Sequence, residues 1–178
     1  MPNYLKKYSL YFRSLSQGLH QFKYIADDKF FDFFPDSEVK QGKVLIKVNI
    51  TVQTSNLILE ILMKGTVKMQ CDLCLDEFDL PIKYKANLFV DFGEISSDLT
   101  DIDEKLTLAF SENEIDLSQH FYEYIHLSLP TRRVHKKDEN GKSRCNQEMI
   151  EKIKQFTINA QQEEVIDPRW EELKKLNN

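Results

Sequence analysis

Two cysteines three positions apart, Cys71 and Cys74, form a Cys-x-x-Cys motif, and Cys145 is the only other cysteine of the chain. Thiols at this spacing can bind one metal ion, act as a redox pair, or serve as small apolar residues of a tight turn. A structural zinc site needs four sulfur or imidazole ligands, commonly a Cys-x-x-Cys pair and a second pair from a distant part of the sequence. The available second pair is His135 and Cys145. The predicted zinc ligands are therefore Cys71, Cys74, His135 and Cys145.

Two alternatives to a metal site stay open at this point. The nine residues between His135 and Cys145 exceed the gap of about two to five residues found in common zinc knuckles. Without metal, Cys71 and Cys74 would only shape a turn. His135 would then be a surface histidine, and Cys145 would begin a helix whose dipole favours its thiolate. A redox pair would exchange disulfides, but such pairs usually stand at the start of a helix, whereas this motif lies between two predicted strands.

The charged residues are unevenly distributed along the chain. Residues 91–104 contain six carboxylates and no base, whereas six basic side chains surround His135 with only Asp138 and Glu139 among them. A cluster of positive charge next to a turn is a candidate surface for phosphate. The predicted RNA-binding residues are Arg132, Arg133, Lys136, Lys137, Lys142 and Arg144. The alternative is that both stretches are ordinary solvated loops.

Alternating apolar residues predict a β-sheet in the first two thirds of the chain. Residues 20–25, 44–52 and 78–90 have the two-residue period of half-buried strands, and residues 57–63 and 105–110 are further expected strands. A turn at residues 54–56 predicts an antiparallel hairpin, and Gly65 marks a bulge or bend in its second strand. We expect a curled antiparallel sheet or a partly open barrel, with the Cys-x-x-Cys motif joining two long strands. The phenylalanines of residues 30–34 are expected in the core.

Helices are predicted in the last third, which makes the fold class α+β. The first follows Asp116 as N-cap and stops before Pro130. The second follows Cys145, and its apolar stripe of Met149, Ile153, Phe156 and Ala160 is expected to face the core. A short helix opens at Asp167-Pro168-Arg169-Trp170. We expect residues 1–160 to form a single domain and residues 161–178 to form a C-terminal tail with this short helix.

The composition limits the class of protein. A chain of 178 residues with 41% hydrophobic residues can bury one substantial core. No apolar run of about 18 residues predicts a membrane span, and the first residues lack the pattern of a secretory leader. An odd number of cysteines fits a reducing compartment, so we expect a cytoplasmic protein without a membrane partner. The net charge of −5 argues against non-specific coating of nucleic acid and leaves room for a local basic contact.

A series of short motifs resembles a known family. In chain order they are Leu15-x-x-Gly18-Leu19-His20, Phe30-Phe31, Gly65-x-Val67, Cys71-Asp72-Leu73-Cys74-Leu75-x-x-Phe78, Ile115-Asp116-Leu117, Leu129-Pro130 and Cys145-Asn146. This order is similar to that of the YceD family of bacteria and plastids, the large ribosomal RNA subunit accumulation proteins. The similarity runs from about Leu10 to about Phe156, and the motif around Cys71 and Cys74 is its most specific part.

The resemblance implies a role in the accumulation or maturation of large-subunit (23S) ribosomal RNA, without a known catalytic activity. Its implied partners are this RNA, the pre-50S particle, or a basic ribosomal protein that contacts the acidic face. Family members often carry further cysteines near the C-terminus. Here only Cys145 is present, with His135 upstream, which converts the implied site to one with three cysteines and one histidine. The sequence contains no glycine-rich phosphate loop and no hydrolase motif.

The alternative to such a binding protein is an enzyme that uses the Cys-x-x-Cys motif. It would be a thiol-disulfide exchanger or a metal-dependent hydrolase. The hydrolase lacks a general base at a matching position. We therefore expect a non-enzymatic factor for ribosome biogenesis.

Overall fold

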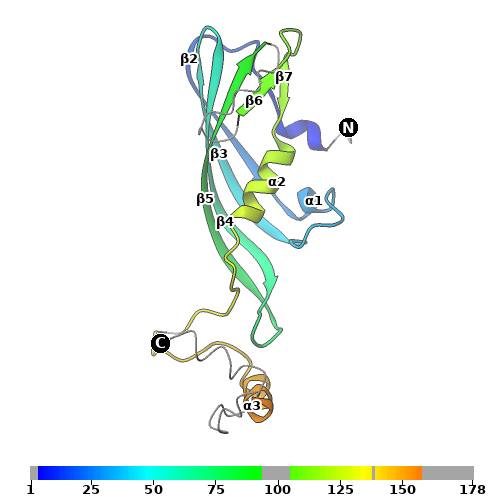
Figure 1. Cartoon of the computed structure of the whole chain (residues 1–178), viewed down its shortest axis with the longest axis vertical. Helices are drawn as coiled ribbons and strands as arrows, with labels where there is room; N and C mark the ends of the chain where they lie inside the picture. The colour runs from blue at the N-terminus through cyan, green and yellow to red at the C-terminus, as the bar shows by residue number, and fades with distance from the viewer. Residues whose placement is uncertain (1–3, 94–104, 138, 158–178) are drawn as a thin grey trace, which may run out of the picture.

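A computed structural model of the chain describes residues 4–93, 105–137 and 139–157. Seven strands, three α-helices and one 3-10 helix lie within these ranges (Figure 1). The elements in chain order are η1 (Leu5–Tyr8), β1 (Ser9–Tyr11), β2 (Gly18–Ala26), α1 (Asp28–Phe31), β3 (Gly42–Val52), β4 (Asn56–Gln70), β5 (Glu77–Phe92), β6 (Lys105–Leu108), β7 (Glu114–Asp116), α2 (Ser118–Leu127) and α3 (Gln147–Phe156).

The main sheet has five strands in the order β2-β3-β4-β5-β6, and β1 pairs separately with β7. Neighbours from β2 to β5 are antiparallel, as expected. The sheet is open because its two edge strands, β2 and β6, do not pair with each other. The α+β class is therefore confirmed. One detail differs from a wholly antiparallel sheet, since β6 runs parallel to β5. Parallel neighbours need a connection of about a dozen residues, and residues 93–104 provide that length.

One face of the sheet is buried and the other faces solvent. On β3, Val44, Ile46, Val48 and Ile50 are fully buried, whereas the residues between them are exposed or half-buried. This alternation is the two-residue period of a strand, and the antiparallel register aligns the apolar set of β4 with it. The predicted half-buried strands are thereby confirmed.

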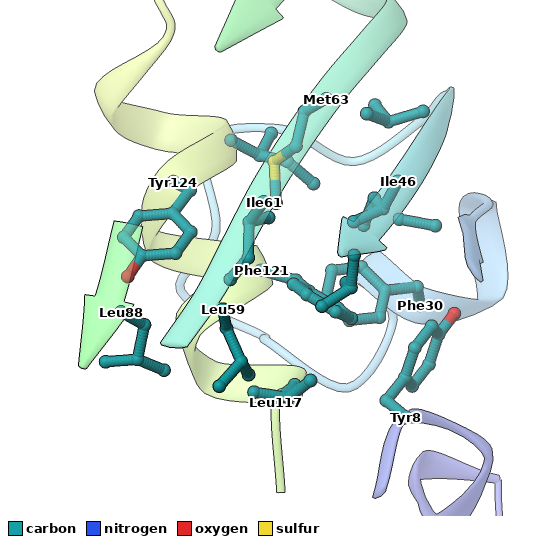
Figure 2. Close-up of a cluster of buried hydrophobic side chains, with 14 of the residues drawn as sticks. Tyr8, Phe30, Ile46, Leu59, Ile61, Met63, Leu88, Leu117, Phe121 and Tyr124 are labelled. Carbon is teal, nitrogen blue, oxygen red and sulfur yellow. The ribbon is translucent and has the colours of Figure 1, made fainter. Parts of the chain in front are cut away.

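Helix α2 covers the buried face (Figures 1 and 2). Its apolar residues and the preceding Leu117 pack with the inner residues of β3, β4 and β5. Phe30 and Phe31 of α1 join the same cluster, which confirms the expected core position for these two phenylalanines, whereas Phe33 and Phe34 are only half-buried. The rings of Tyr8 and Phe30 meet edge to face at 4.9 Å, a favourable geometry for aromatic pairs.

Gly65 is explained by a close approach of two backbones rather than by a bulge. Pairing runs through it without interruption, with Gly65 opposite Val44. A Cβ atom at this position would lie 2.2 Å from the Lys43 carbonyl oxygen and 2.6 Å from the Val44 Cα. Only glycine fits there, because such distances are far below van der Waals contact. Of the two expectations for Gly65, the bulge is therefore wrong, and the bend stays a prediction.

Helix α2 begins and ends close to the predicted limits. Leu117 occupies the N-cap position, and the Asp116 Oδ1 accepts a hydrogen bond of 2.9 Å from the Ser118 N–H. The predicted N-cap at Asp116 is therefore wrong by one position, although the Asp116 side chain still accepts a hydrogen bond from the first residue of the helix. The helix ends at Leu127, before Pro130.

Helix α3 contradicts the expectation of a core-facing stripe. Asn146 caps it by accepting hydrogen bonds from the Glu148 and Met149 N–H groups, but no residue of α3 is buried. Phe156 is 83% exposed and Ile153 is 38% exposed. The reason is position, since α3 lies beyond the β4–β5 turn, away from the buried face of the sheet (Figure 1).

Four predictions concern residues outside the described ranges. They are the acidic stretch from residue 94 to 104, Ala160 of the apolar stripe, the helix at Asp167–Trp170, and the boundary between residues 1–160 and 161–178. These stay predictions. Among the described residues, no helix is long and apolar enough to cross a membrane.

Candidate metal centre

The Cys-x-x-Cys motif forms a tight turn between β4 and β5. The Cys71 N–H donates to the Asp76 carbonyl at 2.9 Å, and the Leu75 N–H donates to the Cys71 carbonyl at 2.9 Å. Leu75 has a φ of 63°, the left-handed conformation that reverses a chain sharply. The turn therefore folds back on itself and places the Cys71 and Cys74 thiols on one side.

The chain that follows α2 is held to this turn by two hydrogen bonds between Asp72 and Arg133, one between backbone groups and one to the Asp72 side chain. The Asp72 N–H donates to the Arg133 carbonyl at 2.8 Å, and the Arg133 N–H donates to the Asp72 Oδ2 at 2.6 Å. His135 comes two residues later and so enters the site beside Cys74.

An isolated β-bridge brings Cys145 back to the same place. Lys137 pairs antiparallel with Ser143, and the Cys145 N–H donates to the Ser143 Oγ at 3.2 Å. The bridge closes the segment between His135 and Cys145 into a loop, so the long gap between these two residues does not separate them in space. The objection raised by their spacing is thereby removed.

The four predicted ligand residues converge. One potential ligand atom from each of Cys71, Cys74, His135 and Cys145 lies within 4.8 Å of the others. The Cys71 and Cys145 Sγ atoms are 3.8 Å apart, and the Cys74 Sγ is 3.5 Å from the His135 Nδ1. Tetrahedral zinc, with Zn–S of about 2.3 Å and Zn–N of about 2.0 Å, requires S–S separations of about 3.8 Å and S–N separations of about 3.5 Å. The residues present thus fit a zinc ion.

An apolar shell surrounds the cluster. The three thiols are almost completely buried, at 0%, 1% and 4% exposure for Cys71, Cys74 and Cys145. The Phe78 ring packs on the His135 imidazole with centroids 4.6 Å apart. Further apolar side chains in contact with the thiols are Leu73, Val134, Met149 and Ile150. Such a shell excludes water and is typical of a structural site.

The surroundings favour a thiolate at Cys71. Burial acts to raise the pKa of its thiol, but hydrogen bonds from the backbones of Cys74, Leu73 and His135 and from the His135 side chain lower this pKa to about 6. At Cys145 the Ser143 hydroxyl acts to lower the pKa, but burial and the neighbouring thiols outweigh it and raise the pKa. The Cys71 thiol therefore ionises readily, whereas ionisation of the neighbouring Cys145 thiol would need a cation.

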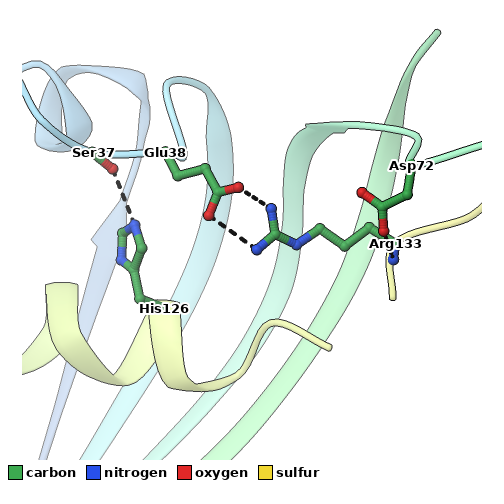
Figure 3. Close-up of polar contacts among 5 residues, drawn as sticks. All are labelled: Ser37, Glu38, Asp72, His126 and Arg133. Carbon is green, nitrogen blue, oxygen red and sulfur yellow. Dashed lines mark hydrogen bonds and ion pairs between the residues drawn. The ribbon is translucent and has the colours of Figure 1, made fainter. Parts of the chain in front are cut away.

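The basic segment around His135 separates into two groups. Five of its side chains are exposed, namely Arg132, Lys136, Lys137, Lys142 and Arg144. Arg133 differs, because both of its terminal guanidinium nitrogens bond the Glu38 carboxylate, with 3.0 Å between Nη2 and Oε2 (Figure 3). The guanidinium holds the pKa of Glu38 below its usual value. Arg133 therefore ties the segment to the loop before β3.

The sequence did not indicate Glu38, because its partner lies 95 residues away. A second contact joins the same loop to α2, since the Ser37 Oγ lies 3.2 Å from the His126 Nε2 (Figure 3). Both contacts hold the chain between α2 and the metal centre in place.

The protein has an open five-stranded sheet with a helix on one face, and a cluster of three cysteines and one histidine that could hold a metal ion lies at the end of its longest hairpin. The family model described as "Large ribosomal RNA subunit accumulation protein YceD" matches residues 59–177, and the chain belongs to this family. The match includes all four ligand residues. No curated protein and no solved structure matches the chain.

Proposed function

We propose that the protein is a non-enzymatic factor that supports the accumulation or maturation of 23S ribosomal RNA by binding RNA of the pre-50S particle. The observation that carries this proposal is the position of the basic loop in a member of this family. Four exposed basic residues lie between the ligand residues His135 and Cys145, so a bound metal would fix both ends of the loop. A loop held in this way presents its charges to phosphate in one arrangement.

Zinc is the proposed metal. Sulfur and imidazole ligands in a tetrahedron are its preferred surroundings, and the separations of the donor atoms fit its bond lengths. When bound, the ion would crosslink the β4–β5 turn to the segment after α2.

The same geometry disfavours the two enzymatic alternatives. A catalytic zinc usually has three protein ligands and a fourth position open to water, whereas this cluster offers four protein ligands. A thiol-disulfide exchanger needs an accessible thiolate, whereas each thiol here is at most 4% exposed. A structural role for the cysteines accounts for both features.

We propose the same contact residues, partners and compartment that the sequence predicts. The phosphate-binding residues are Arg132, Lys136, Lys137, Lys142 and Arg144, with Arg133 as the tether of their segment. A basic ribosomal protein is a second partner, facing the acidic stretch of residues 91–104. We propose the cytoplasm as the compartment in which the protein meets both partners.

The experiment is a sucrose gradient of cell lysate at low salt, probed for the protein and for large-subunit RNA. The wild-type protein should sediment with large-subunit precursors. A loop variant with glutamine at the five exposed basic positions should move toward the top, because phosphate contacts supply the affinity. The matched control replaces five exposed lysines elsewhere with glutamine, namely Lys6, Lys29, Lys40, Lys152 and Lys154.

Wild-type protein found only at the top, together with normal large-subunit RNA in cells that lack the protein, would contradict the proposal. If the loop variant and the control variant both sediment like the wild type, the basic loop does not contact the RNA.

A further inference from the structure

The solvent-facing side of the main sheet carries a group of lysines that lies apart from the metal centre. We call this surface the lysine face. Its members come from β2, β3, β4 and β5 and are Lys23, Lys43, Lys47, Lys64, Lys83 and Lys85. All are exposed except Lys47, which is half-buried.

The register of the strands shows that these lysines are neighbours. Residues that pair directly across strands lie on the same face, with Cβ atoms about 4.5–5.5 Å apart. Lys23 pairs with Lys47, and Lys64 pairs with Lys83. The row of Lys23 and Lys47 continues through Leu62 to Lys85. The charges thus cover a width of three strand spacings, about 14 Å.

The arrangement costs stability. Like charges directly opposite each other in a sheet are destabilising, and the face contains two such pairs. Among these six lysines, only Lys85 forms an ion pair with a described residue, namely Glu60 at 2.7 Å. Glu60 also accepts a hydrogen bond of 2.8 Å from Asn49 and belongs to the next row. Six lysines on one face, with Glu60 as their only ion-pair partner among the described residues, indicate an anionic partner in a chain of net charge −5.

The residues between the lysines indicate how the partner is recognised. The three rows hold, besides lysine, only Ile25, Leu45, Leu62, Thr66 and Pro81. These rows contain no aromatic ring on which a base could stack and no carboxylate that would repel phosphate. Single-stranded RNA is bound largely by stacking on aromatic side chains, whereas duplex RNA is recognised by its shape and its phosphates.

We propose that the lysine face binds the phosphate backbone of double-helical RNA, independently of base sequence. The inference rests on the proposed function, in that ribosomal RNA is the duplex RNA which the protein meets. It adds a second contact surface to the loop between His135 and Cys145.

The test measures binding of the full-length chain to a fluorescent RNA duplex of about 20 base pairs, by anisotropy over a range of salt concentrations. The face variant carries K23Q, K47Q, K64Q and K83Q. The matched control removes the same number of exposed lysines elsewhere, with K6Q, K40Q, K152Q and K154Q. The face variant should bind at least about tenfold more weakly, with a slope of log affinity against log salt that is shallower by about 0.9 per lost phosphate contact. The control variant should bind within about twofold of the wild type.

The melting temperature separates a role of these lysines in RNA binding from a role in the stability of the fold. Removing opposed like charges should leave the melting temperature of the face variant equal to or above that of the wild type, although RNA binding falls. If the fourfold variant does not fold, the single variants K47Q and K64Q should each weaken binding without lowering the melting temperature.

Equal duplex affinity of the face variant and the wild type would overturn the inference. Tighter binding of the wild type to phosphatidylserine vesicles or to an acidic peptide than to the duplex would also overturn it, because the face would then serve a membrane or a protein. Failure of the proposed function has a different signature. In that case the wild type binds the duplex through the lysine face but does not sediment with large-subunit precursors.

Discussion

At the scale of single residues, burial and charge oppose each other in the candidate metal centre. Three thiols and one imidazole share a volume in which every donor atom lies within 4.8 Å of the others. Zinc is bound by thiolates, and thiolates buried in an apolar shell repel one another unless a cation neutralises them. The hydrogen bonds that lower the Cys71 pKa favour the thiolate of this one ligand. A bound ion would favour the thiolates of the other two cysteines. Metal binding energy is therefore expected to be folding energy for this end of the molecule.

The zinc ligands give the first prediction. The purified wild-type protein should carry about one zinc per chain, and chelation should lower its melting temperature. Cys71→Ser and His135→Ala should lose the metal and destabilise the β4–β5 turn. His135→Cys is the matched control and should keep it, because a set of four cysteines also binds zinc. Metal analysis and thermal denaturation measure both effects.

Metal-free wild-type protein whose thiols oxidise reversibly to a disulfide, with normal folding of Cys71→Ser, would instead support the redox alternative.

The tether between Glu38 and Arg133 gives the second prediction. Glu38→Gln should lower the free energy of unfolding by about 0.5–1 kcal/mol at pH 7, since the pair is partly exposed to solvent. The pKa of Glu38 is lowered in the folded protein, so its contribution is complete above the unfolded value of about 4.3 and is lost as the pH falls through the folded pKa. The difference between variant and wild type should therefore disappear in acid. Denaturant titrations over a range of pH check this.

Glu77→Gln is the control for that measurement, because Glu77 is an exposed carboxylate near the same turn. A Glu38→Gln effect that is the same at every pH would contradict an electrostatic tether.

At the scale of elements, the sequence pattern predicts those features that depend only on residues close together in the chain. The alternating residues of β3 predict a half-buried strand because side chains of a strand point to opposite faces, and the structure has that strand. The parallel pairing of β6 could not be predicted in this way, since it depends on the path taken by the whole chain. The same limit applies to α3, whose apolar stripe predicts burial although no sheet surface lies beside it.

The functional residues show the same division. From the sequence alone, the types and spacing of Cys71 and Cys74 allow a metal site, a redox pair or a tight turn. The bridge between Lys137 and Ser143, which brings Cys145 to His135, carries no local signal. The lysines of the lysine face appear in the sequence as ordinary polar residues of alternating strands. Only the register shows that they are neighbours.

Gly65 gives the prediction at this scale. Gly65→Ala should destabilise the protein by about 1–3 kcal/mol, because the new Cβ would force β3 and β4 apart in the middle of the sheet. Thr66→Ala changes the adjacent residue, which is exposed, and serves as the control, with an effect within about 0.5 kcal/mol. Equal stability of the two variants would mean that the strands do not approach as closely as described.

At the scale of the whole molecule, the hydrophobic core extends along the long β4–β5 hairpin as far as Met69 and Leu80, and the candidate metal centre lies beyond it, at the turn of this hairpin (Figure 1). Helix α2 packs on the inner face of the sheet, and the cluster of three cysteines and one histidine, with a small set of apolar contacts of its own, organises the turn. A small second cluster of this kind suits a structural metal, which replaces a hydrophobic core that the hairpin tip cannot form. The basic loop belongs to this end, and we expect its shape to depend on the metal.

The proposed support of large-subunit ribosomal RNA accumulation can be tested directly in cells that lack the protein. The measurement is the ratio of large-subunit to small-subunit RNA in these cells, before and after complementation. We expect a lowered ratio that the wild type restores, that His135→Cys restores as well, and that Cys71→Ser does not restore. A normal ratio in cells that lack the protein would show that large-subunit RNA accumulates without it.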